Sequence, residues 1–469
     1  MKEQIKSIHF IGINGIGMSS LSNALYNIGY MITGSDYSKY LTAKILLNNN
    51  FRVVLKKNMS NIYLTYFVVF STAIKKNNIE IEISKILNIP IIKRGILLSE
   101  ITFMKNNISI SGSHGKTTTT GLIASVLSLY NLNVDIFIGG NLKSINKNYN
   151  IGLGNYSISE IDESDKSFLY ILPFFNIITN IDNDHINKYD NKILNIKHAF
   201  ITSVKNIAFY GSAFLCTNNK KIREITKFLS IPIITYGLTE ESNIFGYEIN
   251  FFKLFTEFKV SRNYKNKFFS KLNIKLSLTG IHNLLNSLAA ISIATELGIK
   301  DIKIKSAMAS FNGVSRRFDY IGKFLVPTSS INIGYFDLFE DYGHHPSEIF
   351  ETLKSMRNYH FKSRTILIFQ PHRCKRIIEN FENFLKILSL ADLLILTNIY
   401  SLKKENIQLD SSEVAKYLII FEITELILLK NICIFSKILM EIVGNKDSIL
   451  IMGAGSINRL RKKISLISK

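Results

Sequence analysis

A glycine-rich turn at residues 111–118, Ser-Gly-Ser-His-Gly-Lys-Thr-Thr, constrains the fold of this chain more than any other stretch. It follows a short apolar run at 108–110 and precedes a segment, 119–130, with apolar residues at helical spacing. Glycines let backbone N–H groups face an anion, and the start of a helix adds partial positive charge. The strict phosphate-loop pattern is not met, because Ile110 occupies the place of its first glycine. The turn still predicts a phosphate site between a buried strand and a helix.

In such a turn Lys116 reaches the β- and γ-phosphates of a nucleotide, and the Thr117 hydroxyl holds Mg²⁺. The remaining residues of the expected nucleotide-binding loop are Gly112, Ser113, His114, Gly115 and Thr118. The alternative is a plain Gly/Ser turn before a Thr-rich helix. The position of Gly-Lys-Thr, where a strand becomes a helix, favours the phosphate loop.

Acidic segments follow two later strands of the same predicted domain. Strand 156–161 leads into Asp-Glu-Ser-Asp at 162–165, and strand 177–181 leads into Asp-Asn-Asp-His at 182–185. The carboxyl ends of parallel strands meet at one edge of a sheet, where ligands bind. Because Mg²⁺ prefers carboxylate and phosphate oxygens, Glu163 and His185 are candidate ligands of a second Mg²⁺. A solvated acidic loop and a polar helix start are the alternatives for these two segments.

The N-terminus predicts a second phosphate site. A strand at 7–11 precedes the turn Gly12-Ile13-Asn14-Gly15-Ile16-Gly17, a helix at 18–28 and a strand at 30–33, with an acid, Asp36, about 20 residues after the turn. Asn14 replaces the second glycine of the dinucleotide fingerprint, so the turn predicts a phosphate-bearing ligand rather than NAD in particular. Ser71 follows another strand, 67–70, at the ligand-binding edge. A tight turn without a ligand is the alternative.

Composition shifts divide the chain. A polar break at 105–107 ends the first domain, 1–107, and the adjacent Arg316 and Arg317 end the second, 108–317. These arginines are either a phosphate clamp or part of a solvated linker. Strands alternate with helices up to 236, followed by antiparallel strands over 243–278 and helices over 281–297 and 301–311. The third domain, 318–469, has predicted strands at 337–340, 364–369, 393–397, 432–435 and 448–452. Its His344, His345, His372 and Arg373 follow strands and suggest an anionic ligand or a nucleotide at the domain edge, with a capped helix start as the alternative for the paired histidines.

The predicted fold class is α/β with three domains: a Rossmann-like N-terminal domain, a P-loop central domain with a parallel sheet plus a small antiparallel sheet, and a Rossmann-like C-terminal domain. The 469 residues suit about three domains. The net charge is +21, but the lysines are scattered, and abundant Lys, Asn and Ile fit an AT-rich genome. We therefore expect no nucleic-acid partner. No apolar run approaches the roughly 20 residues of a membrane helix, and three distant cysteines fit a reducing cytoplasm.

Nine motifs in register resemble the Mur ligase family over essentially the whole chain: IHFIGINGIGMSSL, SGSHGKTTTT, EIDESDKSF, TNIDNDH, GIHNLLNSLAA, FNGVSRRFD, EDYGHHPSEI, FQPHR and MGAGSI. The first of them, with the DYGHHP and FQPHR blocks, is most similar to the members that add the first amino acid. The resemblance implies an ATP- and Mg²⁺-dependent ligase of peptidoglycan precursor synthesis. Such an enzyme joins L-alanine to the lactyl carboxylate of UDP-N-acetylmuramate through an acyl phosphate, and we expect a cytoplasmic monomer or homodimer.

The resemblance also implies roles for residues. The first domain takes the UDP-sugar through Gly12, Asn14, Gly15, Gly17, Asp36 and Ser71. In the nucleotide site, Asn283 contacts adenine, Asp341 and Tyr342 lie nearby, and Arg316 or Arg317 bridges phosphate and sugar substrate. His344, Arg373 and Arg376 lie near the alanine carboxylate. The chain departs from the family pattern at Asn14, Glu340, Gly343, Cys374 and Ser456.

Four other functions remain open at this stage. A murein tripeptide ligase of cell-wall recycling uses the same sugar nucleotide with a larger amine. A catalytically weak UDP-sugar-binding remnant would keep the fold but lack the chemistry, against which Lys116, Thr117, Glu163 and His185 argue. A nicotinamide oxidoreductase would explain the first glycine turn and leave the phosphate loop without a role. A nucleic-acid binder would show affinity that falls steeply with salt.

Overall fold

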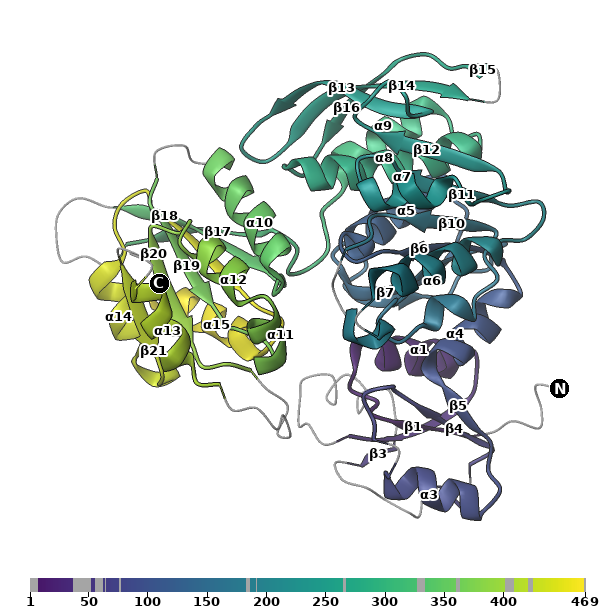
Figure 1. The fold of residues 1–469 in the computed structure, drawn as a ribbon, viewed down its shortest axis with the longest axis horizontal. Coiled ribbons are helices and arrows are strands. Elements are labelled where there is room, and N and C mark those ends of the chain that lie inside the picture. The colour runs from purple at the N-terminus through teal and green to yellow at the C-terminus, as the bar shows by residue number, and fades with distance from the viewer. Residues whose placement is uncertain are drawn as a thin grey trace. The chain divides into compact units, whose positions relative to one another are not determined.

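The computed structural model describes residues 7–36, 52–54, 62–63, 65–75, 77–182, 186–190, 192–264, 267–326, 334–359, 363–400, 409–420 and 425–467. The chain divides into two compact units (Figure 1). Unit 1 comprises Met1–Ile249, Glu257–Ser277 and Asn283–Val314, and unit 2 comprises Asn250–Thr256, Leu278–His282 and Ser315–Lys469. Both contain largely parallel sheets flanked by helices, which confirms the predicted α/β class.

The first sheet of unit 1 has the strand order β3-β2-β1-β4-β5, and its neighbours pair in parallel. All five residues of the central strand are buried, as expected for a strand covered on both faces. The strands are β1 (Ser7–Ile11), β2 (Met31–Ser35), β3 (Arg52–Val54), β4 (Phe67–Phe70) and β5 (Ile91–Lys93). The helices are α1 (Ile16–Asn27), α3 (Ile79–Ile86) and α4 (Arg94–Phe103).

The second sheet of unit 1 has eleven strands in the described part of the chain, with the order β15-β14-β13-β12-β11-β10-β6-β9-β7-β8 and β16 beside β14. The strands around the phosphate loop are β6 (Asn106–Ser111), β9 (Tyr156–Glu160) and β10 (Phe175–Ile178). Because β6 pairs in parallel with both β9 and β10, the three strands end at one edge. The others are β7 (Asp135–Leu142), β8 (Lys147–Asn150), β11 (Ser212–Cys216), β12 (Ile233–Gly237), β13 (Ile244–Phe251), β14 (Thr256–Tyr264), β15 (Lys267–Phe268) and β16 (Leu272–Leu276).

Helices and short 3₁₀ turns connect these strands: α5 (Lys116–Leu129), η2 (Ser167–Leu169), η3 (Ile186–Tyr189), α6 (Ile193–Lys205), α7 (Lys220–Thr226), α8 (Ile281–Glu296) and α9 (Asp301–Ser310). The predicted helix at 119–130 begins three residues earlier, directly after Gly115. Of the strands predicted over 243–278, β14 and β15 pair antiparallel as expected, whereas β13 continues the parallel pairing with β12.

A hairpin of β7 and β8 connects several parts of unit 1. The Asn148 side-chain amide donates to the Ile16 carbonyl at 3.0 Å, and its own carbonyl accepts from Ser20, also at 3.0 Å. Both contacts reach α1, the helix after the first glycine turn. At the hairpin's other side, the Lys143 N–H donates to the Gly313 carbonyl at 3.3 Å. The hairpin therefore touches the first sheet's leading helix and the segment just before the paired arginines.

Unit 2 contains a six-stranded sheet with the order β17-β18-β22-β19-β20-β21, in which only the edge strand β17 is antiparallel to its neighbour. Apolar clusters cover the sheet on both faces. The strands are β17 (Asp319–Leu325), β18 (Tyr335–Asp341), β19 (Thr365–Phe369), β20 (Leu393–Thr397), β21 (Leu426–Leu429) and β22 (Ser448–Met452). The helices are α10 (Pro346–Tyr359), α11 (Cys374–Glu379), α12 (Phe381–Leu388), α13 (Ser411–Ile420), α14 (Phe435–Ile442) and α15 (Arg459–Ile467), with turns η4 (Ile432–Ile434) and η5 (Ser456–Asn458).

The strand predicted at 432–435 is wrong. Residues 432–434 form a 3₁₀ turn that runs into α14, and the strand lies upstream as β21. The Asn431 side chain accepts from the Cys433 N–H at 2.9 Å, so a cap starts a helical turn where the apolar run alone favoured a strand.

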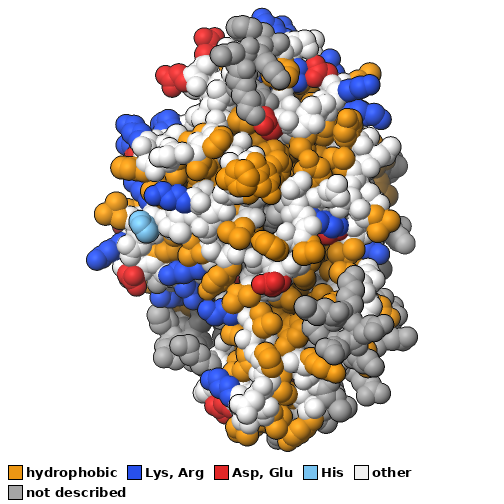
Figure 2. All heavy atoms as spheres, turned by 90° about the vertical axis from the view of Figure 1, so that its right-hand side faces the viewer, with side chains coloured by type: hydrophobic (Ala, Val, Ile, Leu, Met, Phe, Trp, Pro, Cys, Tyr) orange, Lys and Arg blue, Asp and Glu red, His pale blue; other side chains and the backbone are white. Residues whose placement is uncertain are grey.

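One face of the molecule can be compared with the scattered distribution of lysines along the sequence. On the face drawn in Figure 2, Lys and Arg side chains are interspersed with apolar and neutral groups. In the described part of the chain, no helix is long and apolar enough to cross a membrane.

Candidate active site

The phosphate loop has the predicted strand–turn–helix geometry. β6 ends at Ser111 and α5 begins at Lys116, with Gly115 at the helix N-cap in a left-handed conformation (φ +80°). A Cβ at Gly115 would lie 2.5 Å from the Asn286 side-chain oxygen, and one at Gly112 (φ +129°) would overlap the Thr179 hydroxyl. Both positions therefore require glycine, for their dihedral angles and for space.

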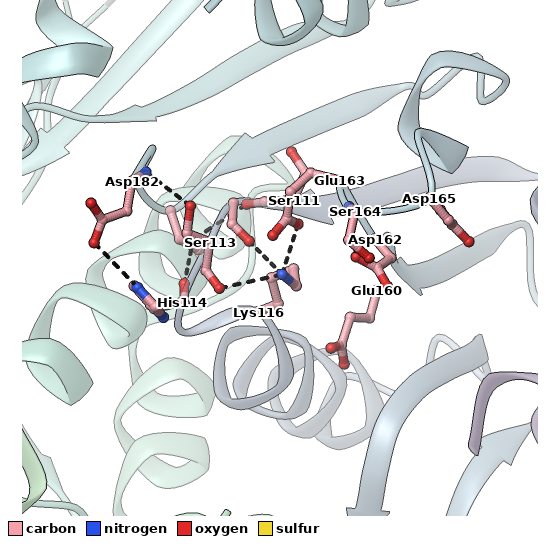
Figure 3. A network of polar contacts seen from close by, with 12 residues as sticks. Ser111, Ser113, His114, Lys116, Glu160, Asp162, Glu163, Ser164, Asp165 and Asp182 are labelled. Atoms are coloured by element: carbon pink, nitrogen blue, oxygen red, sulfur yellow. Dashed lines mark hydrogen bonds and ion pairs between the residues drawn. The ribbon is translucent and has the colours of Figure 1, made fainter. Parts of the chain in front are cut away.

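The end of β10 braces this loop. The Asn180 side chain accepts from the His114 N–H at 2.8 Å and donates to the His114 carbonyl at 3.0 Å. The Asp182 N–H donates to the Ser113 hydroxyl at 2.8 Å. Figure 3 shows Asp182 beside His114, with 3.4 Å between the His114 Nε2 and an Asp182 oxygen. Sequence reasoning did not single out Asn180; its place after the strand beside the phosphate loop was the available signal.

Lys116 and Glu163 meet at the centre of the site. The Lys116 Nζ donates to the Glu163 carboxylate at 2.8 Å and to the Gly112 carbonyl at 2.5 Å (Figure 3). Burial alone would lower the pKa of Lys116, but the carboxylates of Glu163 and Asp162 outweigh it and raise that pKa. Burial raises the pKa of Glu163 to about 7, against the opposing effect of Lys116. The lysine therefore stays charged at neutral pH, while the pKa of Glu163 lies close to neutral pH.

A second carboxylate stands beside Thr117. The Thr117 hydroxyl donates to Glu160 Oε1 at 2.9 Å, and the Gly139 N–H donates to Glu160 Oε2 at 2.7 Å. Glu160 ends β9, three residues before Glu163, and sequence reasoning passed over it in favour of the acidic segment that follows. The proximity of Thr117, a predicted Mg²⁺ ligand, to a carboxylate on the neighbouring strand was the missed signal.

The other predicted residues of the central domain are placed as follows. Thr118 is buried in the first turn of α5. Asn283 is buried on α8, three residues before Asn286, whose side chain adjoins Gly115. His185 lies outside the described residues. On its C-terminal side, the Tyr189 hydroxyl donates to the Glu163 carbonyl at 2.6 Å, which anchors the acidic loop.

The first glycine turn brings its predicted residues together. Gly12 has a φ of +81°, and Gly15 is the N-cap of α1. The Asn14 N–H donates to an Asp36 carboxylate oxygen at 2.9 Å, so the acid at the end of β2 closes onto the turn. Ser71 lies on the other side, 3.9 Å from the Cβ position of Gly12. Gly17, in the first turn of α1, packs against Arg94.

In unit 2, the two linker arginines differ in their contacts. The Arg316 Nε lies 3.0 Å from the buried Glu340 carboxylate, and its Nη2 donates to the Gly453 carbonyl at 2.5 Å. Arg316 and Arg317 both stack over the Tyr342 ring, at 5.0 and 5.3 Å from its centre. Asp341 accepts from the Phe318 N–H at 2.7 Å and the Gly343 N–H at 2.6 Å. A Cβ at Gly343 would overlap the terminal methyl carbon of Met452 and lie 2.7 Å from an Asp341 carboxylate oxygen.

The residues predicted to bind the amino-acid substrate lie beside a cluster of aromatic rings that follows strands of the same sheet. The His344 ring lies 5.4 Å from the His372 ring, which stacks on Tyr400 at 5.5 Å. Arg376, on α11, is buried with its Nη1 3.4 Å from the His372 Nδ1, and Arg373 is the N-cap of that helix, with a φ of +64°. Burial, reinforced by the positive charge of His344, Arg376 and Arg373, lowers the pKa of His372 to about 3.

Comparison with known proteins identifies the family. The sequence matches the Mur ligase family catalytic domain over residues 7–105 and the Mur ligase middle domain over residues 110–294. It is 38% identical to a UDP-N-acetylmuramate–L-alanine ligase of Bordetella petrii, with 98% of each chain covered, and 36% identical to one of Neisseria gonorrhoeae, with 100% of this chain and 99% of the relative covered.

Solved structures agree with this assignment. A UDP-N-acetylmuramate–alanine ligase from Thermotoga maritima superposes with a TM-score of 0.82 at 25% identity, covering 99% of each chain. A murein peptide ligase from Psychrobacter arcticus shares the fold, with a TM-score of 0.74 at 22% identity and 98% of each chain covered. With both family domains matched in order along the sequence and relatives above 30% identity over nearly the full length, the chain belongs to the Mur ligase family.

Proposed function

We propose that this protein joins L-alanine to UDP-N-acetylmuramate at the expense of ATP. The lactyl carboxylate of the sugar attacks the γ-phosphorus of ATP, ADP leaves, and an acyl phosphate results. The amine of L-alanine then attacks the acyl carbon, inorganic phosphate leaves, and the amine gives up a proton to form the amide. The relatives that carry this name align over the full chain, which supports this reaction rather than a partial one.

The observation that carries the proposal is the group of side chains around the phosphate loop. Lys116 and Glu163 stand at the loop with Thr117 and Glu160 beside them. Lys116 and Thr117 come from the first turn of α5, Glu160 ends β9, and Glu163 lies in the acidic loop that follows β9. Phosphoryl transfer depends mostly on positioning and on neutralising charge. The largely buried Lys116 ammonium at the loop neutralises charge on the transferring phosphate, because its positive charge opposes that of two approaching anions.

The residues fit Mg²⁺. The Thr117 hydroxyl and the Glu160 and Glu163 carboxylates are hard oxygen donors, which this cation prefers. Bound Mg²⁺ would offset the repulsion between the phosphates and the attacking carboxylate. Thr117 with Glu160 would hold one ion, and Glu163 with His185 the other.

The three-domain division 1–107, 108–317 and 318–469 assigns the remaining roles. The turn at Gly12–Gly17, with Asp36 and Ser71, takes the UDP-sugar. Asn283 and Asp341 serve the nucleotide. Arg316 or Arg317, which both stack over the Tyr342 ring, bridges phosphate and sugar. His344, Arg373 and Arg376 recognise the alanine carboxylate.

Phosphate release tests the proposal. Purified protein receives ATP, Mg²⁺ and UDP-N-acetylmuramate, and amino acids are added one at a time. Release that requires L-alanine supports the proposal, whereas release only with an L-alanyl-D-glutamyl tripeptide assigns the recycling reaction instead. Lys116→Ala should slow release about 10²–10³-fold, as loss of a key charge-stabilising donor does. Lys197→Ala, at a partly exposed ion pair with Glu224, is the matched control and should release phosphate at the wild-type rate.

A further inference from the structure

Arg94, the first residue of α4, lies between the start of α1 and the acidic loop, which the proposed reaction uses for different ligands. Its Nη2 lies 2.7 Å from Oδ2 of Asp165 and 3.4 Å from the Ser167 hydroxyl. The Arg94 and Asp165 side chains are only 14% and 7% exposed. On its other side, a Cβ at Gly17 would lie 3.2 Å from the Arg94 Nη1. The guanidinium therefore packs between the first turn of α1 and the acidic loop.

The stability of α4 does not explain an arginine at this position. The N-terminus of a helix carries partial positive charge, so a cation in the first turn is unfavourable by a few tenths of a kcal/mol or more. The start of this helix is instead fitted to the acidic loop. A Cβ at Gly95, the next residue, would lie 2.5 Å from the Ser167 Cβ, so the helix could not approach so closely with any side chain there.

Asp165, the partner of Arg94, organises the turn around Glu163. Its Oδ1 accepts from the Ser167 N–H at 2.8 Å, and the Ser167 hydroxyl donates to the Asp162 carbonyl at 3.0 Å. These bonds join the two ends of the segment 162–167. Figure 3 shows Glu163 directed toward Lys116 and Asp165 directed away from it. Arg94 thus holds the acidic loop from the side opposite the phosphate loop.

Simple adhesion between the first two domains is the alternative explanation. Other contacts already provide adhesion: the Ser99 hydroxyl donates to the Tyr170 carbonyl at 2.7 Å, and Lys93 lies 3.5 Å from the Tyr170 hydroxyl. Those contacts reach the residue after η2, neither the acidic loop nor the glycine turn. Arg94 differs because one guanidinium meets both Gly17 and Asp165.

We propose that Arg94 is a positioning residue that couples the first glycine turn to the loop that orients Glu163. This inference rests on the proposed function, in which the turn takes the diphosphate of the UDP-sugar and Glu163 helps to hold Mg²⁺. A diphosphate at the start of α1 attracts the guanidinium, and the short ion pair passes any displacement on to Asp165. Because such coupling is reciprocal, the UDP-sugar and the Mg²⁺-nucleotide change each other's affinity by the same factor.

The test measures that factor in the full-length protein. Calorimetry gives the dissociation constant of a Mg²⁺-bound, non-hydrolysable ATP analogue with and without saturating UDP-N-acetylmuramate. We expect the two dissociation constants, without and with the sugar, to differ by a factor of about 5 or more in the wild type. In Arg94→Met and in Asp165→Asn we expect a ratio of these constants near 1. Both variants should also lose about 10–100-fold in kcat, as is typical when a supporting partner of a metal ligand is removed. Arg94→Lys should restore part of the ratio, and Lys93→Met, the matched control, should keep it whole.

Three outcomes would overturn the inference: a wild-type ratio of 1, an unchanged ratio in folded Arg94→Met, or effects of Arg94→Met and Asp165→Asn that simply add in the double variant. If Arg94→Met does not fold, two other variants test the inference. Asp165→Asn changes the other partner of the ion pair, and Arg94→Lys keeps the positive charge at position 94. A failure of the proposed function is seen separately, because wild-type protein without alanine-dependent phosphate release refutes that function while the affinity ratio still reports on Arg94.

Discussion

Replacing Gly139 by alanine should weaken Mg²⁺ binding without removing any candidate ligand. The Cβ of an alanine at this position would lie 2.7 and 2.9 Å from the two carboxylate oxygens of Glu160, well inside ordinary contact distance. The carboxylate must therefore move away from the Thr117 hydroxyl and from the residue 139 N–H, which it now meets at 2.9 and 2.7 Å. Hydrogen bonds to a charged acceptor contribute about 1.5 kcal/mol each, and the bond from the residue 139 N–H is exposed to solvent, so losing both costs at most about 3 kcal/mol.

That free energy corresponds to a shift of roughly 100-fold in an equilibrium constant. In phosphate release at saturating ATP, UDP-N-acetylmuramate and L-alanine, Gly139→Ala should raise the half-saturating Mg²⁺ concentration about 10–100-fold. Excess Mg²⁺ should recover most of the rate, because the carboxylate is displaced and not deleted. Gly246→Ala, whose new methyl would meet its nearest side chains at an ordinary 3.4 Å, is the control. A folded Gly139→Ala protein with the wild-type Mg²⁺ requirement would refute the reasoning.

Three further predictions address the other sites. Asp36→Ala removes the acceptor of the Asn14 N–H and should raise the KM for UDP-N-acetylmuramate about 10-fold; a parallel rise in the KM for ATP would contradict a local role. Gly112→Ala, strained by its φ and blocked by Thr179, should abolish calorimetric binding of an ATP analogue, and retained binding would show that the loop tolerates a side chain. His372, with a pKa lowered to about 3, stays neutral in the folded protein while the unfolded chain protonates near pH 6.5. Its contribution to stability is thus complete above pH 6.5 and falls by about 2 kcal/mol by pH 5, so urea unfolding of His372→Gln should depend less on pH over this range than that of the wild type.

Local patterns were enough for most of the architecture. Apolar runs bounded by polar residues predicted β1 and β4 over their observed bounds, because a strand buried on both faces in a parallel sheet reads as a short apolar block. The same rule failed at 432–435. Two apolar runs lie close together there, and only the capping side chain of Asn431 distinguishes the helical one from the strand.

The parts of the site whose residues are adjacent in the sequence could be predicted. The parts whose residues are distant in the sequence and meet only in the folded chain were harder to predict. The glycine turns and the order of strand, lysine and helix are local, so the phosphate loop could be placed from the sequence. Asn286 adjoins Gly115 across more than 160 positions of the chain, and Glu160 reaches Thr117 from a neighbouring strand. Such contacts depend on strand order and register, which no local pattern contains.

The turn between β7 and β8 would ordinarily be a tolerant place for inserted residues, because short exposed hairpin turns accept extra length at little cost. Here the two strands are clamped at several points: Gly139 to a carboxylate of the active site, Lys143 to the segment before the paired arginines, and Asn148 to the helix behind the first glycine turn. A longer turn would shift one of these three contacts relative to the other two, so that they could not all form. The hairpin thus acts as a spacer of fixed length, and evolution can change its side chains more freely than its residue count.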